Sequence, residues 1–125
     1  MKHSIAAEKA FKFSVRVYKL HKYLIQEHRE YVIARQILRS GTSIGANIEE
    51  ALGAQSEKEF ISKLSTSYKE ARETSYWLRL LKEVDLIAAD HFESIHKDCL
   101  ELITILSSIL LSSKKKMANE PKIKK

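Results

Sequence analysis

Residues 40–60 read SGTSIGANIEEALGAQSEKEF and contain all three glycines of the 125-residue chain. Around and within this stretch, residues recur at the three- and four-residue spacing of one helix face: Ile33, Ile37, Ser40 or Gly41, Ile44, Ile48 and Ala51. Gly41 and Gly45 lie four residues apart and therefore on one side of that helix. Because a glycine inside a helix costs about 1 kcal/mol relative to alanine, we expect a neighbouring helix to approach closely at both glycines.

The same stretch also predicts a turn and the start of another helix. The first of these helices ends near Leu52 and Gly53, and Ser56 then begins a Ser-Glu-Lys-Glu sequence. In such a capping box the serine caps the new helix and Glu59 reaches back to the preceding backbone. Residues 40–60 therefore predict a helical hairpin, but they indicate no substrate and no reaction.

Three motifs extend from this hairpin: SIxxNIxEA at residues 43–51, SxxxFIxxL at 56–64 and KEAxETxYWLxLL at 69–81. Together they resemble the family of 23S ribosomal RNA intervening-sequence proteins, and the likeness spans residues 5–113. The resemblance implies an antiparallel four-helix bundle that assembles as a ring-shaped homopentamer, without a settled biochemical activity. A similar bundle is the accessory protein of diversity-generating retroelements, which binds a reverse transcriptase and nucleic acid.

The composition indicates a single helical domain in a reducing compartment. One proline and three glycines leave little material for sheets or long loops. The only cysteine, Cys99, excludes an internal disulfide and a cysteine-based zinc site. The N-terminus reaches a charge too early for a signal peptide, and the longest apolar stretch, residues 102–111, is shorter than the about 20 residues that span a bilayer. We therefore expect a cytoplasmic protein that does not enter a membrane.

Periodicity predicts four helices, which begin at Ser4 or Ala7, Tyr31, Ser56 and a residue between Ala88 and Asp90, and end near Gln26, Leu52, Val84 and Ser113. The links between them are short, so consecutive helices should be antiparallel neighbours. The predicted fold is an all-α, antiparallel, up-down-up-down four-helix bundle over residues 1–113. Asp90 and Glu93 have the spacing to cap the last helix. Residues 114–125 form a Lys-rich tail that we expect to be disordered.

The first predicted helix carries two apolar stripes on nearly opposite sides. The inner stripe consists of Ala6, Ala10, Phe13, Val17, Leu20 and Leu24. The outer stripe consists of Phe11, Val15, Tyr18 and Ile25. In a lone bundle the outer stripe would face water. We therefore expect it to form a homo-oligomer interface, and the family resemblance makes a pentamer the expected state.

The net charge of +6 is unevenly distributed. Residues 1–43 hold nine Lys and Arg against three Glu, residues 44–111 hold seven against twelve acidic residues, and residues 112–125 hold six Lys against one Glu. This pattern predicts electrostatic binding of nucleic acid, RNA in particular. The candidate residues are Lys9, Lys12, Arg16, Lys19, Arg35, Arg39, Lys114, Lys115 and Lys116. The alternatives are ordinary solvated helix faces, or a protein-binding adaptor, for a reverse transcriptase for example.

Metal binding and catalysis have weaker support in the sequence. Glu93 and His96 have the Glu-x-x-His spacing of di-iron bundles, but such sites need that pair twice, together with two further glutamates. Glu50, Glu70 and Glu73 are candidates to converge. Cys99 lies in an apolar periodicity, which predicts a buried, inert thiol. We therefore expect no enzyme activity, no cofactor and no metal.

Asn47 is a polar amide near the inner face of its helix, where it needs hydrogen-bond partners. Glu50 lies one turn away, and Glu70, Glu73 and Tyr76 lie on the facing helix of the hairpin. We predict that these five residues form a structural polar network that fixes the helix register, and a functional site is the alternative.

Overall fold

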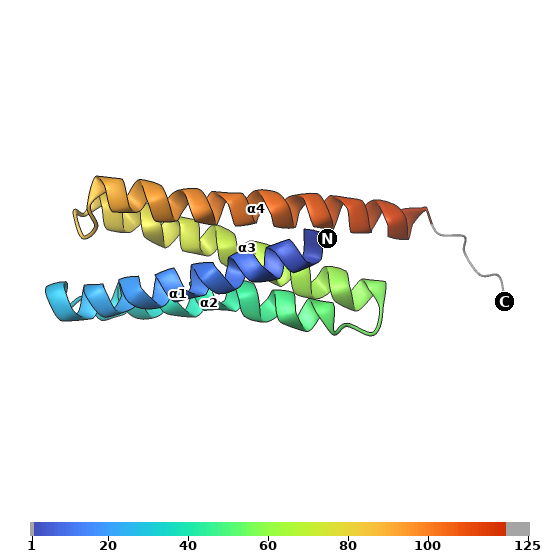
Figure 1. Cartoon of the computed structure of the whole chain (residues 1–125), viewed down its shortest axis with the longest axis horizontal. Coiled ribbons are helices and arrows are strands. Elements are labelled where there is room, and N and C mark those ends of the chain that lie inside the picture. Colours follow the sequence, from blue (N-terminus) through green and yellow to red (C-terminus); the bar gives the residue numbers. More distant parts are fainter. Residues whose placement is uncertain (1, 120–125) are drawn as a thin grey trace.

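The computed structural model describes residues 2–119, and the side chains of residues 5–119. Four helices follow one another along the chain (Figure 1): α1 (Lys2–His28), α2 (Val32–Leu52), α3 (Glu57–Glu83) and α4 (Ala89–Ala118). The described part of the chain contains no strand. The predicted all-α, up-down-up-down four-helix bundle is therefore confirmed.

Each helix packs against two others, so the bundle has four faces. α2 packs against α1 and α3, and α4 packs against α3 and α1, whereas the described residues of the diagonal pairs do not meet. With this order of contacts, the α1–α4 face and the α2–α3 face lie on opposite sides of the molecule, which determines where the basic residues point. In Figure 1 α1 crosses α3 at an angle, with α4 along one edge of the molecule and α2 along the other.

The core follows the predicted helix faces. The whole inner stripe of α1 is buried, as are Ile37, Ile44 and Ile48 of α2. Ile33, which belongs to the predicted face of α2, is only half-buried and packs against the core, as do Phe60 of α3 and Ile103 of α4. Hydrophobic burial of these periodic faces is the main stabilising contribution to the bundle.

The two glycines of α2 differ in what surrounds them. A Cβ atom placed on Gly41 would lie 2.7 Å from Cγ1 of Val17 in α1, which is too close for any real contact. A Cβ atom on Gly45 would lie 3.5 Å from Cβ of Ala10, an ordinary van der Waals distance. α1 therefore approaches α2 closely at both glycines, as predicted, and at Gly45 the Ala10 backbone carbonyl lies 3.6 Å from the Cβ position. Only Gly41 leaves no room for a side chain, because α1 presents Val17 there and the small Ala10 at Gly45.

The predicted side-chain cap is present at the start of α3 but not at the start of α4, although α4 begins at Ala89, within the predicted range. The Ser56 hydroxyl accepts a hydrogen bond from Glu59 N at 3.0 Å, and the Glu59 carboxylate accepts one from Gln55 N at 3.1 Å. At α4 the N-cap is Ala88, which makes no side-chain cap, and Asp90 accepts a hydrogen bond from the adjacent His91 N. The prediction that Asp90 and Glu93 cap α4 was wrong, because the helix already begins at Ala89.

α4 continues past its predicted end near Ser113 to Ala118. Ser113 itself is buried, and the three lysines that follow are good helix formers near a C-terminus that favours cations. Lys114, Lys115 and Lys116 therefore project from an ordered helix. The rest of the predicted tail, residues 120–125, lies outside the described residues. Over residues 2–119, no helix combines the length and apolar character needed to cross a membrane.

Candidate nucleic-acid interface

The four predicted cations of α1, Lys9, Lys12, Arg16 and Lys19, form a basic stripe that lies along α4. Three of them are paired with acidic side chains. Lys9 Nζ lies 3.2 Å from a Glu101 carboxylate oxygen, and the Arg16 guanidinium lies 2.7 Å from Asp98. Both partners belong to α4, so these ion pairs join the first helix to the last. Each carboxylate therefore neutralises a cation that was predicted from the sequence to bind nucleic acid.

The other two cations of this stripe are more exposed. Lys12 lies 3.3 Å from Glu8, one turn away on the same helix, in the i,i+4 arrangement that stabilises helices weakly. Lys19 is exposed and has no ion pair among the residues the structure describes. Of the four predicted α1 cations, Lys19 is therefore the one that is not neutralised nearby.

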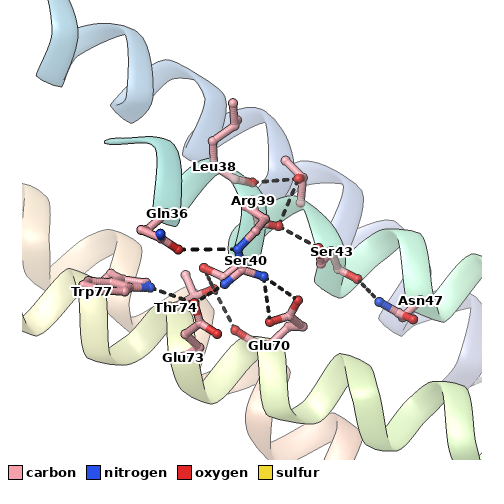
Figure 2. A network of polar contacts seen from close by, with 11 residues as sticks. Gln36, Leu38, Arg39, Ser40, Ser43, Asn47, Glu70, Glu73, Thr74 and Trp77 are labelled. Carbon is pink, nitrogen blue, oxygen red and sulfur yellow. Dashed lines mark hydrogen bonds and ion pairs between the residues drawn. The ribbon is translucent and has the colours of Figure 1, made fainter. Parts of the chain in front are cut away.

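Arg39 faces α3 and forms the centre of a polar network (Figure 2). Its guanidinium contacts both Glu70, at 3.0 Å, and Glu73. The Trp77 indole N–H donates to the Glu73 carboxylate at 3.0 Å. The hydrogen bond with Glu73 raises the pKa of Arg39, and the hydrogen bonds from Trp77 and then Arg39 lower the pKa of Glu73. This network ties α2 to α3, so Arg39 already has two anionic partners.

The nine predicted basic residues consequently do not form one surface. The α1 stripe lies on the α1–α4 face, whereas Arg39 lies on the opposite α2–α3 face. Arg35 is exposed on α2, and Lys114, Lys115 and Lys116 are exposed at the end of α4. None of these last four has an ion pair within the described part of the chain.

The polar network predicted around Asn47 forms only in part. Glu70 and Glu73 do come together, but through Arg39 rather than through Asn47. The Asn47 amide donates to the Ser43 carbonyl of its own helix at 2.8 Å, and Glu50 pairs with Lys63. Tyr76 is exposed on another side of α3. The prediction missed Arg39, whose long side chain spans the gap between the helices.

Buried hydroxyls provide the remaining polar contacts between α2 and α3. The Thr74 and Ser40 hydroxyl oxygens lie 2.9 Å apart, and Ser67 donates to the Ile44 carbonyl at 2.8 Å. All three hydroxyl-bearing residues are buried. Because buried polar groups need partners, these bonds favour one register of α2 against α3.

A second basic surface, which the sequence analysis missed, lies on the α3–α4 face. Its cations on α3 are Lys69, Arg72, Arg79 and Lys82, all exposed and without an ion pair among residues 5–119. This surface was missed because acidic residues outnumber basic ones over residues 44–111 as a whole. Several of those carboxylates pair with cations on the other faces, as Glu70, Glu73, Asp98 and Glu101 do. Lys69, Arg72, Arg79 and Lys82 are spaced three, seven and three residues apart, which places them on one side of a helix. This spacing was the signal in the sequence that could have revealed the surface.

Near the α3–α4 turn this face is hollowed into a groove of about 530 Å³, which we call the loop-end groove. The residues that line it include Tyr76, Arg79, Lys82, Glu83, Phe92 and His96. The Phe92 and His96 rings stack with centroids 4.8 Å apart, and Lys82 Nζ lies 5.1 Å from the centre of the Phe92 ring. The Arg79 guanidinium lies 5.9 Å from the centre of the Tyr76 ring. The groove thus combines cations with aromatic rings.

His96 reports on the charge of this groove. One ring nitrogen lies 2.8 Å from the Ser75 hydroxyl of α3. Burial is the first cause that lowers the pKa of His96, and the nearby positive charges of Arg79 and Lys82 add to it. The lining of the groove holds these two cations and one acidic residue, Glu83.

A second hollow, the tail-end groove, lies farther along the same face. It has a volume of about 420 Å³, and Tyr68, Lys69, Ser107 and Lys114 are among the residues that line it. Arg72 lies beside it, with its guanidinium 5.9 Å from the centre of the Tyr68 ring and 3.3 Å from the Tyr68 hydroxyl. Cations and tyrosines therefore alternate along the α3–α4 face from one groove to the other.

Comparison with known proteins gives the family of this bundle. The family model described as 23S rRNA-intervening sequence protein matches residues 2–108, which is most of the chain. The chain belongs to the 23S rRNA-intervening sequence protein family. The resemblance seen in the motifs of residues 43–81 is thereby confirmed.

A solved structure similar to this 23S rRNA-intervening sequence protein comes from Bacteroides thetaiotaomicron. It is a crystal structure of a protein of unknown function from the S23 ribosomal protein family. The two chains are 48% identical, with a TM-score of 0.87 over 88% of this chain and 98% of the relative. No curated protein matches the chain. The comparisons therefore give the family and the fold, and they leave the function to be argued from the surfaces.

The outer stripe of this family member is exposed as predicted, with one exception. Phe11 is 71% exposed, and Val15 and Tyr18 are also exposed. Ile25 is half-buried and packs against the core, so it does not belong to the exposed part of the stripe. One helical turn earlier, a ring nitrogen of His21 lies 3.1 Å from the Ala34 carbonyl oxygen of α2. The remaining three residues form an apolar strip on the outside of α1.

The thiol and the candidate metal ligands were also located. Cys99 is buried and its Sγ contacts the Ala71 carbonyl at 3.3 Å, and burial raises the pKa of the thiol to about 12. The prediction that Cys99 is buried is confirmed. Among the side chains that the structure describes, no three His, Cys, Asp or Glu residues lie close enough together to hold a metal ion. Glu50 pairs with a lysine, and Glu70 and Glu73 with Arg39.

Proposed function

We propose that this 23S rRNA-intervening sequence protein binds nucleic acid, RNA in particular, without catalysing a reaction. The observation that supports this is the α3–α4 face, where exposed cations without ion pairs alternate with aromatic rings. These cations are Lys69, Arg72, Arg79, Lys82 and Lys114. Binding of this kind draws its affinity from the release of counterions from the phosphate backbone.

The α3–α4 face contributes more than the α1 stripe, because its cations are not already engaged. Arg16 must leave Asp98, and Lys9 must leave Glu101, before either can contact a phosphate with its full charge. Arg79 and Lys82 have no carboxylate partner to give up within the described structure. Lys19, Arg35, Lys115 and Lys116 remain secondary contributors to the proposed binding.

RNA is the form of nucleic acid to test first. The family description names 23S rRNA, which supports an RNA ligand without identifying it. The basic face extends along α3 from Lys69 to Lys82 and reaches Lys114 on α4. Electrostatic binding along such a face is governed by phosphate spacing more than by base sequence.

A salt titration of RNA binding with two matched variants tests this proposal. Arg72→Glu/Arg79→Glu and Lys12→Glu/Arg16→Glu change the net charge equally, but on different faces. We expect the first variant to weaken binding roughly tenfold or more and to flatten the dependence of log affinity on log salt by about 0.7 to 0.9 per lost phosphate contact. The second should have the smaller effect.

The same titration can overturn the proposal. If the unaltered protein bound neither RNA nor duplex DNA at low salt, the proposal would be refuted and the protein-adaptor function would be favoured. A larger effect of the α1 variant would place the binding surface on the α1–α4 face, as the sequence alone predicted. Circular dichroism of both variants controls for unfolding, which matters most for Arg16→Glu because Arg16 is half-buried in its ion pair with Asp98.

A contribution from protein contacts is also part of the proposal. The exposed strip of Phe11, Val15 and Tyr18 is more apolar than a monomer surface usually is over such a distance. We propose that it joins copies of this chain into a homo-oligomer, with the pentamer implied by the family resemblance as the expected state. A ring of copies would multiply the positive charge of each α3–α4 face.

A further inference from the structure

We propose that the loop-end and tail-end grooves form one track for single-stranded nucleic acid, in which unpaired bases stack on Tyr76 and Tyr68. The inference rests on the proposed nucleic-acid binding and adds the form of strand that is bound. It follows from the alternation of aromatic rings and cations along the α3–α4 face, which a purely electrostatic surface does not require.

Tyr76 provides the first stacking platform. Tyr76 lines the loop-end groove and is 52% exposed, so a ligand can reach its ring. Trp77 meets it edge-on, with centroids 5.1 Å apart, and Arg79 lies over the ring. An incoming base can stack on the ring while its phosphate is neutralised by Arg79 or Lys82, the combination that proteins use to hold single strands.

Tyr68 provides the second platform, where its half-buried ring lines the tail-end groove. The two tyrosines lie eight residues apart on α3, which corresponds to about 12 Å along the helix axis. Arg72 lies between them, and Lys69 and Lys114 flank the tail-end groove. Both grooves have volumes in the range of ordinary small-ligand sites, so each is large enough for one base and its sugar.

Glu83 sets one end of the track. It is an acidic residue in the lining of the loop-end groove and lies next to the α3–α4 turn. A phosphate placed beside it would be repelled, so the strand should leave the groove before the turn. Toward the other end, the cations continue through Lys114 to the end of α4, so the strand should extend in that direction.

Duplex nucleic acid and acidic peptides fit this face less well. In a duplex the bases stack on one another, so Tyr68 and Tyr76 would gain no base to stack on and only the cations would contribute. An acidic peptide would form ion pairs with the cations, but it would supply no planar base to stack on the exposed Tyr76 ring. The arrangement therefore favours an unpaired strand.

The test compares one RNA of about twelve nucleotides, within the usual site size for such proteins, as a single strand and as a duplex with its complement. Fluorescence anisotropy at one salt concentration measures both affinities for the full chain. We expect tighter binding of the single strand. Tyr76→Ala should weaken single-strand binding roughly tenfold and leave duplex binding unchanged, whereas Tyr76→Phe should bind like the unaltered protein.

Tyr31→Ala is the matched control, since Tyr31 is 53% exposed, precedes α2 and lines neither groove. It should leave both affinities unchanged. Trp77, the only tryptophan, gives an independent readout, because a base stacked on the adjacent Tyr76 should alter its fluorescence.

Four results would overturn the inference. Binding of single strand and duplex with equal affinity, unaffected by Tyr76→Ala, would leave the proposed nucleic-acid binding intact and remove the stacking track. Binding of neither form would remove both proposals. Displacement of the RNA by polyglutamate as readily as by unlabelled RNA would make the face a site for acidic peptides. A lower oligomer mass for Tyr76→Ala in light scattering would make it an interface between copies of the chain.

Discussion

Gly41 lies against Val17 of α1 with no room for a side chain, whereas Gly45 faces the small Ala10. The β-branched Val17 has little freedom to move away, because its χ1 rotamer is fixed in a helix. The two glycines occupy the same helix, four residues apart, so they form a natural pair for testing how closely α1 and α2 pack.

We expect Gly41→Ala and Gly45→Ala to have opposite effects on stability. Gly41→Ala should lower the free energy of unfolding by about 1 to 2 kcal/mol, since the overpacking cost exceeds the gain in helix propensity. Gly45→Ala should raise it by up to about 1 kcal/mol. Urea denaturation measures both. If Gly41→Ala were as stabilising as Gly45→Ala, the close contact with Val17 would not exist in solution.

His96 makes stability depend on pH in a defined direction. Burial and the charges of Arg79 and Lys82 lower its pKa in the folded state below the ordinary value of 6.5. The unfolded chain therefore takes up the proton first as the pH falls. We expect the free energy of unfolding to be unaffected by this group well above pH 6.5 and to decrease as the pH is lowered through and below that value.

Denaturation curves of His96→Gln between neutral and mildly acidic pH test this dependence. The variant should show a shallower loss of stability over that range than the unaltered protein. His91→Gln, at an exposed position of the same helix, is the control. An unchanged slope in His96→Gln would mean that the imidazole is as easily protonated in the folded bundle as in the unfolded chain.

At the scale of the helices, the ends of α1 and α3 are closed by non-glycine residues in a left-handed conformation. Arg29 has φ of 52° and Asp85 has φ of 59°. At the end of α1, the Arg29 and Glu30 backbone N–H groups donate to the Ile25 and Leu24 carbonyls. These hydrogen bonds resemble the helix-ending motif in which glycine is usual, because a left-handed conformation costs other residues about 1 to 2 kcal/mol.

Arg29→Gly should therefore stabilise the bundle. The substitution removes the backbone strain, although the greater freedom of glycine in the unfolded chain offsets part of the gain. We expect a net increase of roughly 0.5 to 1 kcal/mol, seen as a higher midpoint in thermal unfolding. Arg29→Ala, which keeps the strain and removes the same charge, is the control. Equal midpoints for the two variants would contradict the assignment of strain to this turn.

The whole molecule presents two unlike surfaces, an apolar strip on the outside of α1 and a basic face between α3 and α4. If the strip joins copies of the chain, Phe11→Glu should lower the mass measured by light scattering and leave the helical circular dichroism largely unchanged. Ile25→Glu would be a poor test, because that side chain packs on the core. A monomer mass for the unaltered protein at micromolar concentration would refute the proposed assembly.

The sequence by itself determined the four helices, their buried faces and the family. These features follow from local periodicity, since residues three and four apart share a helix face whatever the neighbouring helices do. The capping serine of α3 and the buried cysteine belong to the same class of local signal. The predicted end of α4 near Ser113 was wrong, because the three lysines that follow are compatible both with a helix end and with a helix interior.

Only the tertiary structure decided which charges are neutralised and which remain exposed. Arg16 and Asp98 are 82 residues apart in sequence, and Lys9 and Glu101 are 92 apart, yet each pair meets across the α1–α4 face. A regional count of charges cannot detect such pairs, because it sums over residues that point in different directions. The same packing leaves Arg79 and Lys82 without ion pairs beside Tyr76, although residues 44–111 as a whole have an acidic excess. The candidate site therefore lies on the α3–α4 face.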